Sequence, residues 1–180
     1  MSEKLPTRKE ALKLLREAGC QDNVIKHCEA VAKLAVEIAK KCLQKGFVVN
    51  IELVEIGGLL HDIGRSKTHG VDHAIIGAKI AEELKLPKPI IAIIKRHVGG
   101  GISAEEAEKL GWPADIYTPQ TIEEKIISYA DKLIEGTQRV SIERTIEKFQ
   151  QNGLPPSVIN RIKKLHEEIS SLIGDCQCPK

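Results

Sequence analysis

Aromatic residues are scarce in this chain: one Trp, two Tyr and two Phe make up 3% of its 180 residues. A hydrophobic core must therefore be built mainly from aliphatic side chains. Long apolar runs are also absent, because no stretch approaches the roughly 20 residues of a membrane-spanning helix. The charged N-terminus lacks the apolar segment of a signal peptide. These absences predict a cytoplasmic protein with no membrane partner.

A large excess of charge of one sign is lacking too. The chain has 27 Lys and Arg residues against 25 Asp and Glu residues, and its formal net charge is +2. A strong basic field is what draws a protein to nucleic acid or to an anionic membrane surface. We therefore expect no nucleic-acid partner, and we look for function in a local site.

Two kinds of pattern that would change the fold class are also missing. Cysteine pairs of the CxxC type do not occur among the five cysteines, so reduced thiols are expected. Cys176 and Cys178 are expected to lie in a frayed tail, although the pair could bind a soft metal. Phe47-Val48-Val49 is too short for a convincing strand, and no alternating run is bounded by turn residues.

Helical signals, in contrast, recur along the whole chain. Capping boxes are expected at Thr7 with Glu10, Ser103 with Glu106 and Thr121 with Glu124, and further caps at Asn50 and Asp72. The fold class is therefore all-α, with roughly eight or nine helices packed as one domain. The expected helices are about 8–18, 22–44, 51–61, 73–84, 90–97, 104–110, 122–135, 142–151 and 157–172.

The most informative stretch is residues 57–65, where an apolar helix ends in the adjacent pair His61-Asp62 and Gly64 follows. An imidazole and a carboxylate at the end of an apolar run are costly to bury without compensation. A divalent ion compensates both groups, since His nitrogen and Asp oxygen are its usual ligands. A His–Asp hydrogen bond that caps the helix would explain the pair alone equally well.

Other potential ligands lie on apolar helix faces, namely His27, His73, His97 and Asp131. A single histidine of this kind is more often a hydrogen-bonded core residue than a ligand. Five helices that each direct such a group inward are hard to obtain by independent accidents. Converging helical ligands are the usual way in which an all-α protein builds a metal site. The predicted ligands are His27, His61, Asp62, His73, His97 and Asp131.

The order His27, His61-Asp62, Asp131 resembles the HD superfamily of metal-dependent phosphohydrolases, and His61-Asp62-Ile63-Gly64 resembles its HDIG branch. The resemblance implies a metal-binding core at about 20–140, followed by helices at 141–173 and a tail at 174–180. It implies one or two divalent ions, of Fe, Mn, Ni, Co, Zn or Mg. One ion would take His27, His61, Asp62 and Asp131, and the other would take His73 and His97, with Asp62 bridging.

Within the superfamily, the spacing is most similar to the bacterial hydrolases that split diadenosine tetraphosphate symmetrically. The branch that cleaves cyclic dinucleotides usually has a second His after the one matching His97, and here Val98 follows. The Gly-Tyr-Pro signature of that branch is also missing, which disfavours cyclic dinucleotides. Arg65 stands where the family often has Lys, so a forked donor replaces a point charge.

The resemblance implies hydrolysis of a phosphoester or phosphoanhydride in a nucleotide-like substrate, with metal-bound hydroxide as the nucleophile and His61 and Asp62 as catalytic residues. Arg65, Lys67, Arg96 and Lys132 are the candidate phosphate contacts, although Lys67 fits a solvated surface charge better.

Two alternatives use the same ligands: a di-iron oxygenase, and a silent nucleotide-binding regulatory domain. The segment with Trp112 and Tyr117 is either a lid or a small core anchor. A homodimer is compatible with the sequence, which does not reveal the oligomeric state.

Overall fold

The structure is a computed structural model that describes residues 4–174. In this range nine α-helices and one two-stranded hairpin follow one another, which confirms the predicted all-α class. The elements are α1 (Arg8–Ala18), α2 (Asp22–Gln44), α3 (Ile51–Leu60), α4 (His73–Glu83), α5 (Lys88–Arg96), α6 (Ala104–Lys109), α7 (Ile122–Lys132), β1 (Ile134–Glu135), β2 (Gln138–Arg139), α8 (Ile142–Gln151) and α9 (Pro156–Ile173), with 3-10 turns at Ile63–Ser66 and Val98–Gly100.

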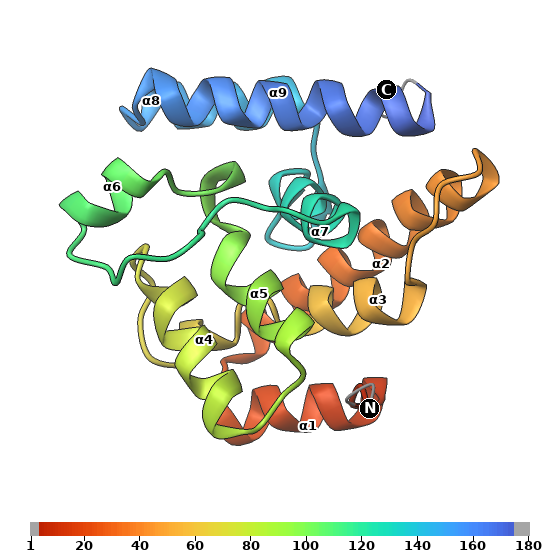
Figure 1. The fold of residues 1–180 in the computed structure, drawn as a ribbon, viewed down its shortest axis with the longest axis vertical. Coiled ribbons are helices and arrows are strands. Elements are labelled where there is room, and N and C mark those ends of the chain that lie inside the picture. The colour runs from red at the N-terminus through yellow and green to blue at the C-terminus, as the bar shows by residue number, and fades with distance from the viewer. Residues whose placement is uncertain (1–3, 175–180) are drawn as a thin grey trace.

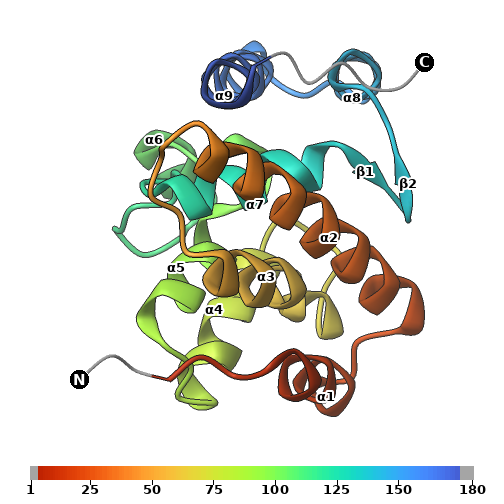
Figure 2. The same cartoon turned by 90° about the vertical axis from the view of Figure 1, so that its right-hand side faces the viewer.

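The helices form a stack (Figures 1 and 2). Helix α1 lies at one end and the pair α8–α9 at the other, with α2, α3, α5 and α7 between them. Two aliphatic clusters fill the stack, one joining α2 and α7 to α8 and α9, the other joining α1 to α2, α3, α4 and α5. The long helix α2 contributes to both clusters, so it is the element that joins the two ends.

Local sequence signals explain most helix starts. The third predicted capping box is only half present, because the Thr121 side chain accepts from Glu124 N while the Glu124 carboxylate accepts from Gln120 N and from Arg96. The predicted cap at Asp72 is wrong, since its carboxylate accepts from Trp112 Nε1 at 2.7 Å. The other two boxes form as predicted, Thr7 with Glu10 and Ser103 with Glu106.

The hairpin was not predicted. The helix expected to reach Glu135 ends at Lys132, and the next residues turn back so that Ile134 pairs with Arg139 and Glu135 with Gln138. Strands of two residues are too short to produce an alternating pattern. Gly136, with φ of +62°, supplies the left-handed conformation that the turn needs.

Two glycines permit close backbone contacts that shape the centre of the fold. A Cβ on Gly58 would lie 2.8 Å from Ala32 Cα, so α3 and α2 cross with almost no space between them. A Cβ on Gly64 would lie only 1.9 Å from the carbonyl oxygen of His73. The turn after α3 therefore packs directly on α4, which brings His73 toward His61 and Asp62.

Among residues 4–174, no helix is both long enough and apolar enough to cross a bilayer. Cys20, Cys28 and Cys42 are buried in the aliphatic core. The cysteine pair predicted to lie in a tail, Cys176 and Cys178, falls outside the described residues.

Candidate metal centre

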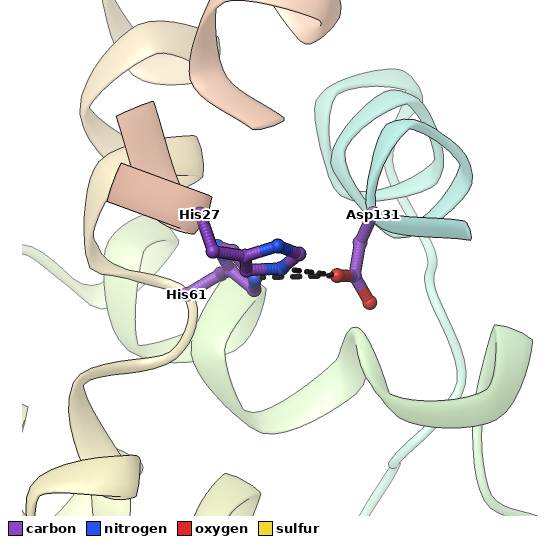
Figure 3. A group of neighbouring side chains, drawn as sticks. All are labelled: His27, His61 and Asp131. Carbon is purple, nitrogen blue, oxygen red and sulfur yellow. Dashed lines mark hydrogen bonds and ion pairs between the residues drawn. The ribbon is translucent and has the colours of Figure 1, made fainter. Parts of the chain in front are cut away.

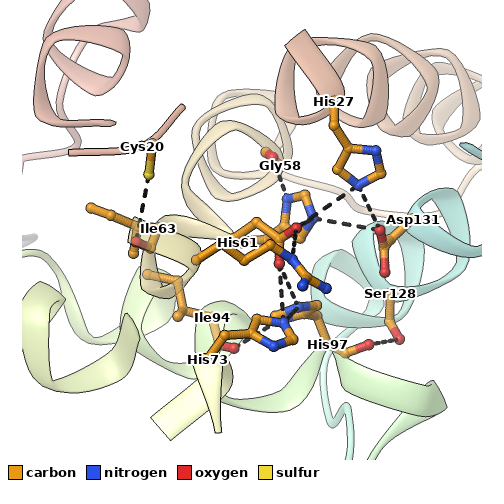
Figure 4. Close-up of polar contacts among 12 residues, drawn as sticks. Cys20, His27, Gly58, His61, Ile63, His73, Ile94, His97, Ser128 and Asp131 are labelled. Carbon is orange, nitrogen blue, oxygen red and sulfur yellow. Dashed lines mark hydrogen bonds and ion pairs between the residues drawn. The ribbon is translucent and has the colours of Figure 1, made fainter. Parts of the chain in front are cut away.

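The six predicted ligands come together between α2, α3, α4, α5 and α7 (Figure 4). Each sits at or near a helix end or on a buried helix face, and five different elements supply the six side chains. Figure 4 shows the four imidazoles directed toward one another, with Asp131 approaching from α7. The contributing residues are His27 from α2, His61 and Asp62 after α3, His73 from α4, His97 after α5 and Asp131 from α7.

One group of donor atoms gathers around Asp131 (Figure 3). His27 Nε2 lies 3.0 Å and His61 Nε2 lies 3.5 Å from Asp131 Oδ1. Asp62 Oδ2 is 3.7 Å from His61 Nε2 and 4.0 Å from His27 Nε2. The donor atoms of His27, His61 and Asp131 all lie within 4.8 Å of one another, which is close enough to share one ion.

A second group gathers around the other oxygen of Asp62. His73 Nε2 lies 3.1 Å and His97 Nε2 lies 3.3 Å from Asp62 Oδ1. The two Nε2 atoms are 3.0 Å apart. Asp62 therefore presents one carboxylate oxygen toward each pair of histidines, which is the arrangement that a bridging ligand requires.

All four imidazoles are oriented by the main chain. The Nδ1 atoms lie 2.7–2.8 Å from carbonyl oxygens, and because a carbonyl only accepts, each Nδ1 must carry its proton. In a neutral ring this leaves a lone pair on Nε2, which points at the carboxylates. The pairs are His27 with Gly136, His61 with Gly58, His73 with Gly70 and His97 with Ile94.

The cluster thus gathers lone pairs and negative oxygens with too few protons between them. His61 Nε2 and Asp62 Oδ1 are both fully buried and lack a hydrogen-bond partner. An unpartnered buried polar atom is costly, and here two of them face the same small space. Imidazole nitrogen and carboxylate oxygen are the donor set of Zn, Mn, Fe, Co and Ni ions. A divalent cation therefore fits these residues.

Electrostatics favour the metal-binding forms. Burial raises the pKa of Asp131, but the charge of Lys132 and the contacts with His27 and His61 outweigh it, so that pKa lies well below its usual range. The pKa of Asp62 is likewise held well below its usual range, because His61 and the other imidazoles outweigh burial. Burial lowers the pKa of His97 to about 4, which keeps that ring neutral.

His27 differs from His97. Burial lowers its pKa, but the neighbouring carboxylates Asp131 and Asp62 raise it more, so the net shift is upward. A proton on His27 and a metal cation beside it would compensate the same negative charge, that of Asp131 and Asp62. His27 is also 17% exposed, whereas His61 is fully buried, so the His27 side of the cluster faces outward.

The four predicted phosphate contacts are placed differently from one another. Arg65 donates from Nε to Asp62 Oδ2 at 2.6 Å, and Lys132 pairs with Asp131, so both lie beside the ligands. Arg96 instead donates to both oxygens of buried Glu124 and to the carbonyl of Ile116, which directs it away from the cluster. Lys67 is exposed.

A cavity of about 430 Å³ opens over the His27 side of the cluster. Its floor includes His27, Asp62 and Asp131, together with Arg65 and Lys132. Its outer wall comes from the unpredicted hairpin and from α8, and sequence reasoning did not connect these segments to the site. The wall residues are Ile134, Glu135, Gly136, Val140, Thr145, Lys148 and Phe149, with Asn23, Val24 and His69 on the remaining sides.

Trp112 and Tyr117 do not line this cavity. They pack edge to face with ring centroids 5.0 Å apart, in a small apolar cluster with Ala74, Ile102 and Ala107. The core-anchor alternative for this segment is the one that the structure supports.

Comparison with known proteins agrees with this geometry. The HD domain family profile matches residues 24–136, which is more than half of the chain and contains all six converging side chains. The chain belongs to the HD domain family. The superfamily suggested by the order of ligands in the sequence is thereby confirmed.

Relatives of this HD domain differ in length and in name. It is 47% identical to protein MJ0778 of Methanocaldococcus jannaschii, covering 91% of this chain and 97% of that protein. It is 41% identical to a tRNA (cytidine(56)-2'-O)-methyltransferase of Picrophilus torridus, covering 94% of this chain but 48% of the methyltransferase. It is 33% identical to ribonuclease Y of Thermosipho melanesiensis, covering 71% of this chain and 22% of that enzyme.

Among solved structures, the HD domain of the L. monocytogenes phosphodiesterase PgpH in complex with cyclic-di-AMP is similar in fold. The TM-score is 0.56 at 21% identity, with coverage of 95% of this chain and 99% of that one. At this identity the likeness concerns the fold alone.

Proposed function

We propose that this HD domain is a metal-dependent phosphohydrolase that cleaves a phosphoester or phosphoanhydride bond in a nucleotide-like substrate. The observation that carries the proposal is the pair of buried atoms without partners, His61 Nε2 and Asp62 Oδ1, at the centre of a cluster of imidazoles and carboxylates. Membership of the HD family supports it. Ribonuclease Y, a relative in sequence, supports it further by its name.

The proposed ligands form two sets. His27, His61, Asp62 and Asp131 would hold one divalent ion, and His73 and His97 would hold a second, with Asp62 shared. Such ions, when bound, lower the pKa of water toward 7 and stabilise negative charge on phosphoryl oxygens. The main-chain hydrogen bonds to Nδ1 keep each ring in the tautomer that the ligands need.

Arg65 and Lys132 are the proposed phosphate contacts. Both line the cavity floor and both are already held against a ligand carboxylate, so their charges are in place before a substrate arrives. Arg65 offers further N–H donors beyond the one used on Asp62, and a guanidinium matches the geometry of phosphate oxygens. Arg96 is not part of the proposal, because Glu124 neutralises it. Lys67 does not line the cavity.

Two groups of candidate substrates follow from the sequence resemblance and from the names of similar proteins. The sequence resemblance to symmetrical diadenosine tetraphosphate hydrolases makes dinucleoside polyphosphates one candidate group. The names of ribonuclease Y and of PgpH add phosphodiesters, as RNA oligonucleotides or cyclic dinucleotides. The methyltransferase name describes a different chemistry, in a protein of which this chain covers about half.

The test combines metal analysis with a hydrolysis screen. The protein as isolated is analysed for transition metals and then assayed with those metals on mononucleotides, dinucleoside polyphosphates, RNA oligonucleotides and cyclic dinucleotides. His61→Ala is expected to lose both bound metal and turnover. The matched control is His166→Gln, since His166 lies on α9 and its Nδ1 contacts the Tyr129 hydroxyl outside the cluster. Full metal content and turnover in the His61 variant would refute the proposal.

A further inference from the structure

We propose that the hairpin and α8 form a nucleoside subsite, in which one base lies against Phe149 while its phosphate rests on the cavity floor. The inference rests on the proposed function for the position of the phosphate. It goes further by naming the substrate as one that carries a nucleoside on the scissile phosphate, and by naming Phe149 as the residue that selects it.

The cavity offers both charged and apolar surface. Its floor carries the carboxylates Asp62 and Asp131 and the cations Arg65 and Lys132. Away from the floor, Val24, Ile134, Val140 and Phe149 supply apolar surface beside the polar residues Glu135, Thr145 and Lys148. A bare phosphate or a short alkyl phosphate would use only the floor. A ligand that uses both parts needs an anionic end and a flat group with apolar faces a short distance away, as in a nucleotide, where the ribose joins the phosphate to the base.

Phe149 is suited to contact a base. Among residues 4–174, and apart from histidines, it is the one aromatic residue that lines the cavity. It is half-buried because it also packs on the aliphatic cluster of α2, α7 and α9. Its ring is therefore held in place before a ligand binds. Bases stack on such rings with little dependence on base identity, since every base has a π face.

Hydrogen bonds and ion pairs join α8 to the end of α7 and to the hairpin. Thr145 donates from Oγ1 to the carbonyl of Lys132 at 2.5 Å, which joins α8 to the end of α7 beside Asp131. Glu135 on the hairpin accepts from Lys148 Nζ at 2.5 Å and from Arg144 Nε at 3.0 Å. The subsite is thus built on the same segment that delivers a proposed metal ligand.

Part of the wall lies beyond the stretch that the family profile matches. The HD domain profile ends at residue 136, whereas Val140, Thr145, Lys148 and Phe149 follow it. The floor residues lie within the matched stretch. We therefore expect the wall residues of α8 to contribute to selectivity and the floor to the common chemistry.

The cavity also limits the size of the bound group. About 430 Å³ is at the lower end of ligand pockets, which span about 300–1,000 Å³. One nucleoside with its phosphate fills such a space, and a second nucleoside would extend beyond the wall into solvent. Recognition is thus expected for the nucleoside on one side of the scissile bond only.

The experiment compares two esters that release the same leaving group. Thymidine 5′-(p-nitrophenyl phosphate) and methyl p-nitrophenyl phosphate both give p-nitrophenolate when water attacks phosphorus, and only the first carries a nucleoside. The wild-type protein is expected to prefer the thymidine ester in kcat/KM. Phe149→Leu should reduce that preference about tenfold, the scale of base stacking on one ring, and leave the methyl ester unchanged.

Two variants make the result specific. Phe149→Tyr keeps the ring and should keep the preference. Ile146→Ala lies on the same helix and packs on the same core without lining the cavity, so it reports any loosening of α8. If Phe149→Leu retains the full preference, or if Ile146→Ala loses it equally, the subsite is refuted although the phosphohydrolase activity stands.

If neither ester is cleaved, turnover does not report on the subsite, and the subsite is tested by binding alone; the proposed function is then decided by the screen described above. Thymidine 5′-monophosphate is titrated into the metal-loaded protein in a calorimeter. Weaker binding by Phe149→Leu than by Phe149→Tyr, by about tenfold, supports the subsite. Equal binding by the two variants overturns it.

Discussion

Replacing Gly64 by alanine tests whether the backbone contact after α3 holds the centre together. The added Cβ would lie 1.9 Å from the carbonyl oxygen of His73 and 2.7 Å from the backbone nitrogen of Gly77. Side-chain Cβ atoms essentially never approach closer than 3.0 Å, and backbone atoms cannot rotate away, so the turn and α4 must separate by about 1 Å. Overpacking costs typically about 1–3 kcal/mol, and we expect about 3 kcal/mol here.

The same displacement affects the site, because His73 Nε2 lies only 3.1 Å from Asp62 Oδ1. A misplacement of about 1 Å can reduce turnover about 100-fold. Urea unfolding of the metal-free protein gives the stability, and metal analysis with the hydrolysis assay gives the effect on the site. Gly70→Ala is the control, since its nearest neighbour would be 3.6 Å from the new Cβ. Equal unfolding midpoints and metal contents in the two variants would refute the reasoning.

Three further predictions address charge and packing. Burial raises the pKa of Glu106, but the hydrogen bond from the Ser103 backbone and the contact with Arg161 outweigh it, so the pKa is lowered. Glu106→Gln should therefore reduce the free energy of unfolding by about 1 kcal/mol above pH 4.5, and by progressively less as pH falls through the lowered pKa. Unfolding measured across this pH range checks the prediction. Arg65→Lys should raise KM more than it lowers kcat, because a forked donor is lost; a purely kcat effect would contradict this. Trp112→Phe removes the hydrogen bond to Asp72 and should lower stability by about 1 kcal/mol with unchanged turnover.

Helix positions could be predicted well because their signals are local. Helices α2 and α8 begin and end at the expected residues, since the apolar spacing and the flanking residues depend only on near neighbours. The convergence of His27, His61 and Asp131 was also predictable, because a polar group on an apolar helix face must find a partner in the core. The structure brings together all six side chains that the sequence singled out.

Features that depend on competition between partners were not predictable. Glu124 was expected to cap its own helix, and instead its carboxylate pairs with Arg96, which a sequence does not reveal because the two lie 28 residues apart. The position of Phe149 at the site could not be predicted for a similar reason. Its place in the cavity wall follows from the turn at Gly136, and two-residue strands leave no periodic pattern to read.

The carbonyl groups that hold the four imidazoles have a consequence for how such a protein tolerates change over evolution. A point mutation replaces a side chain and does not remove the peptide oxygen, so substitution of Ile94 does not delete the acceptor opposite His97. Ring orientation is lost only when a helix end itself moves. Side chains at the carbonyl-bearing positions are therefore expected to be replaceable wherever the new side chain leaves the helix termini in position.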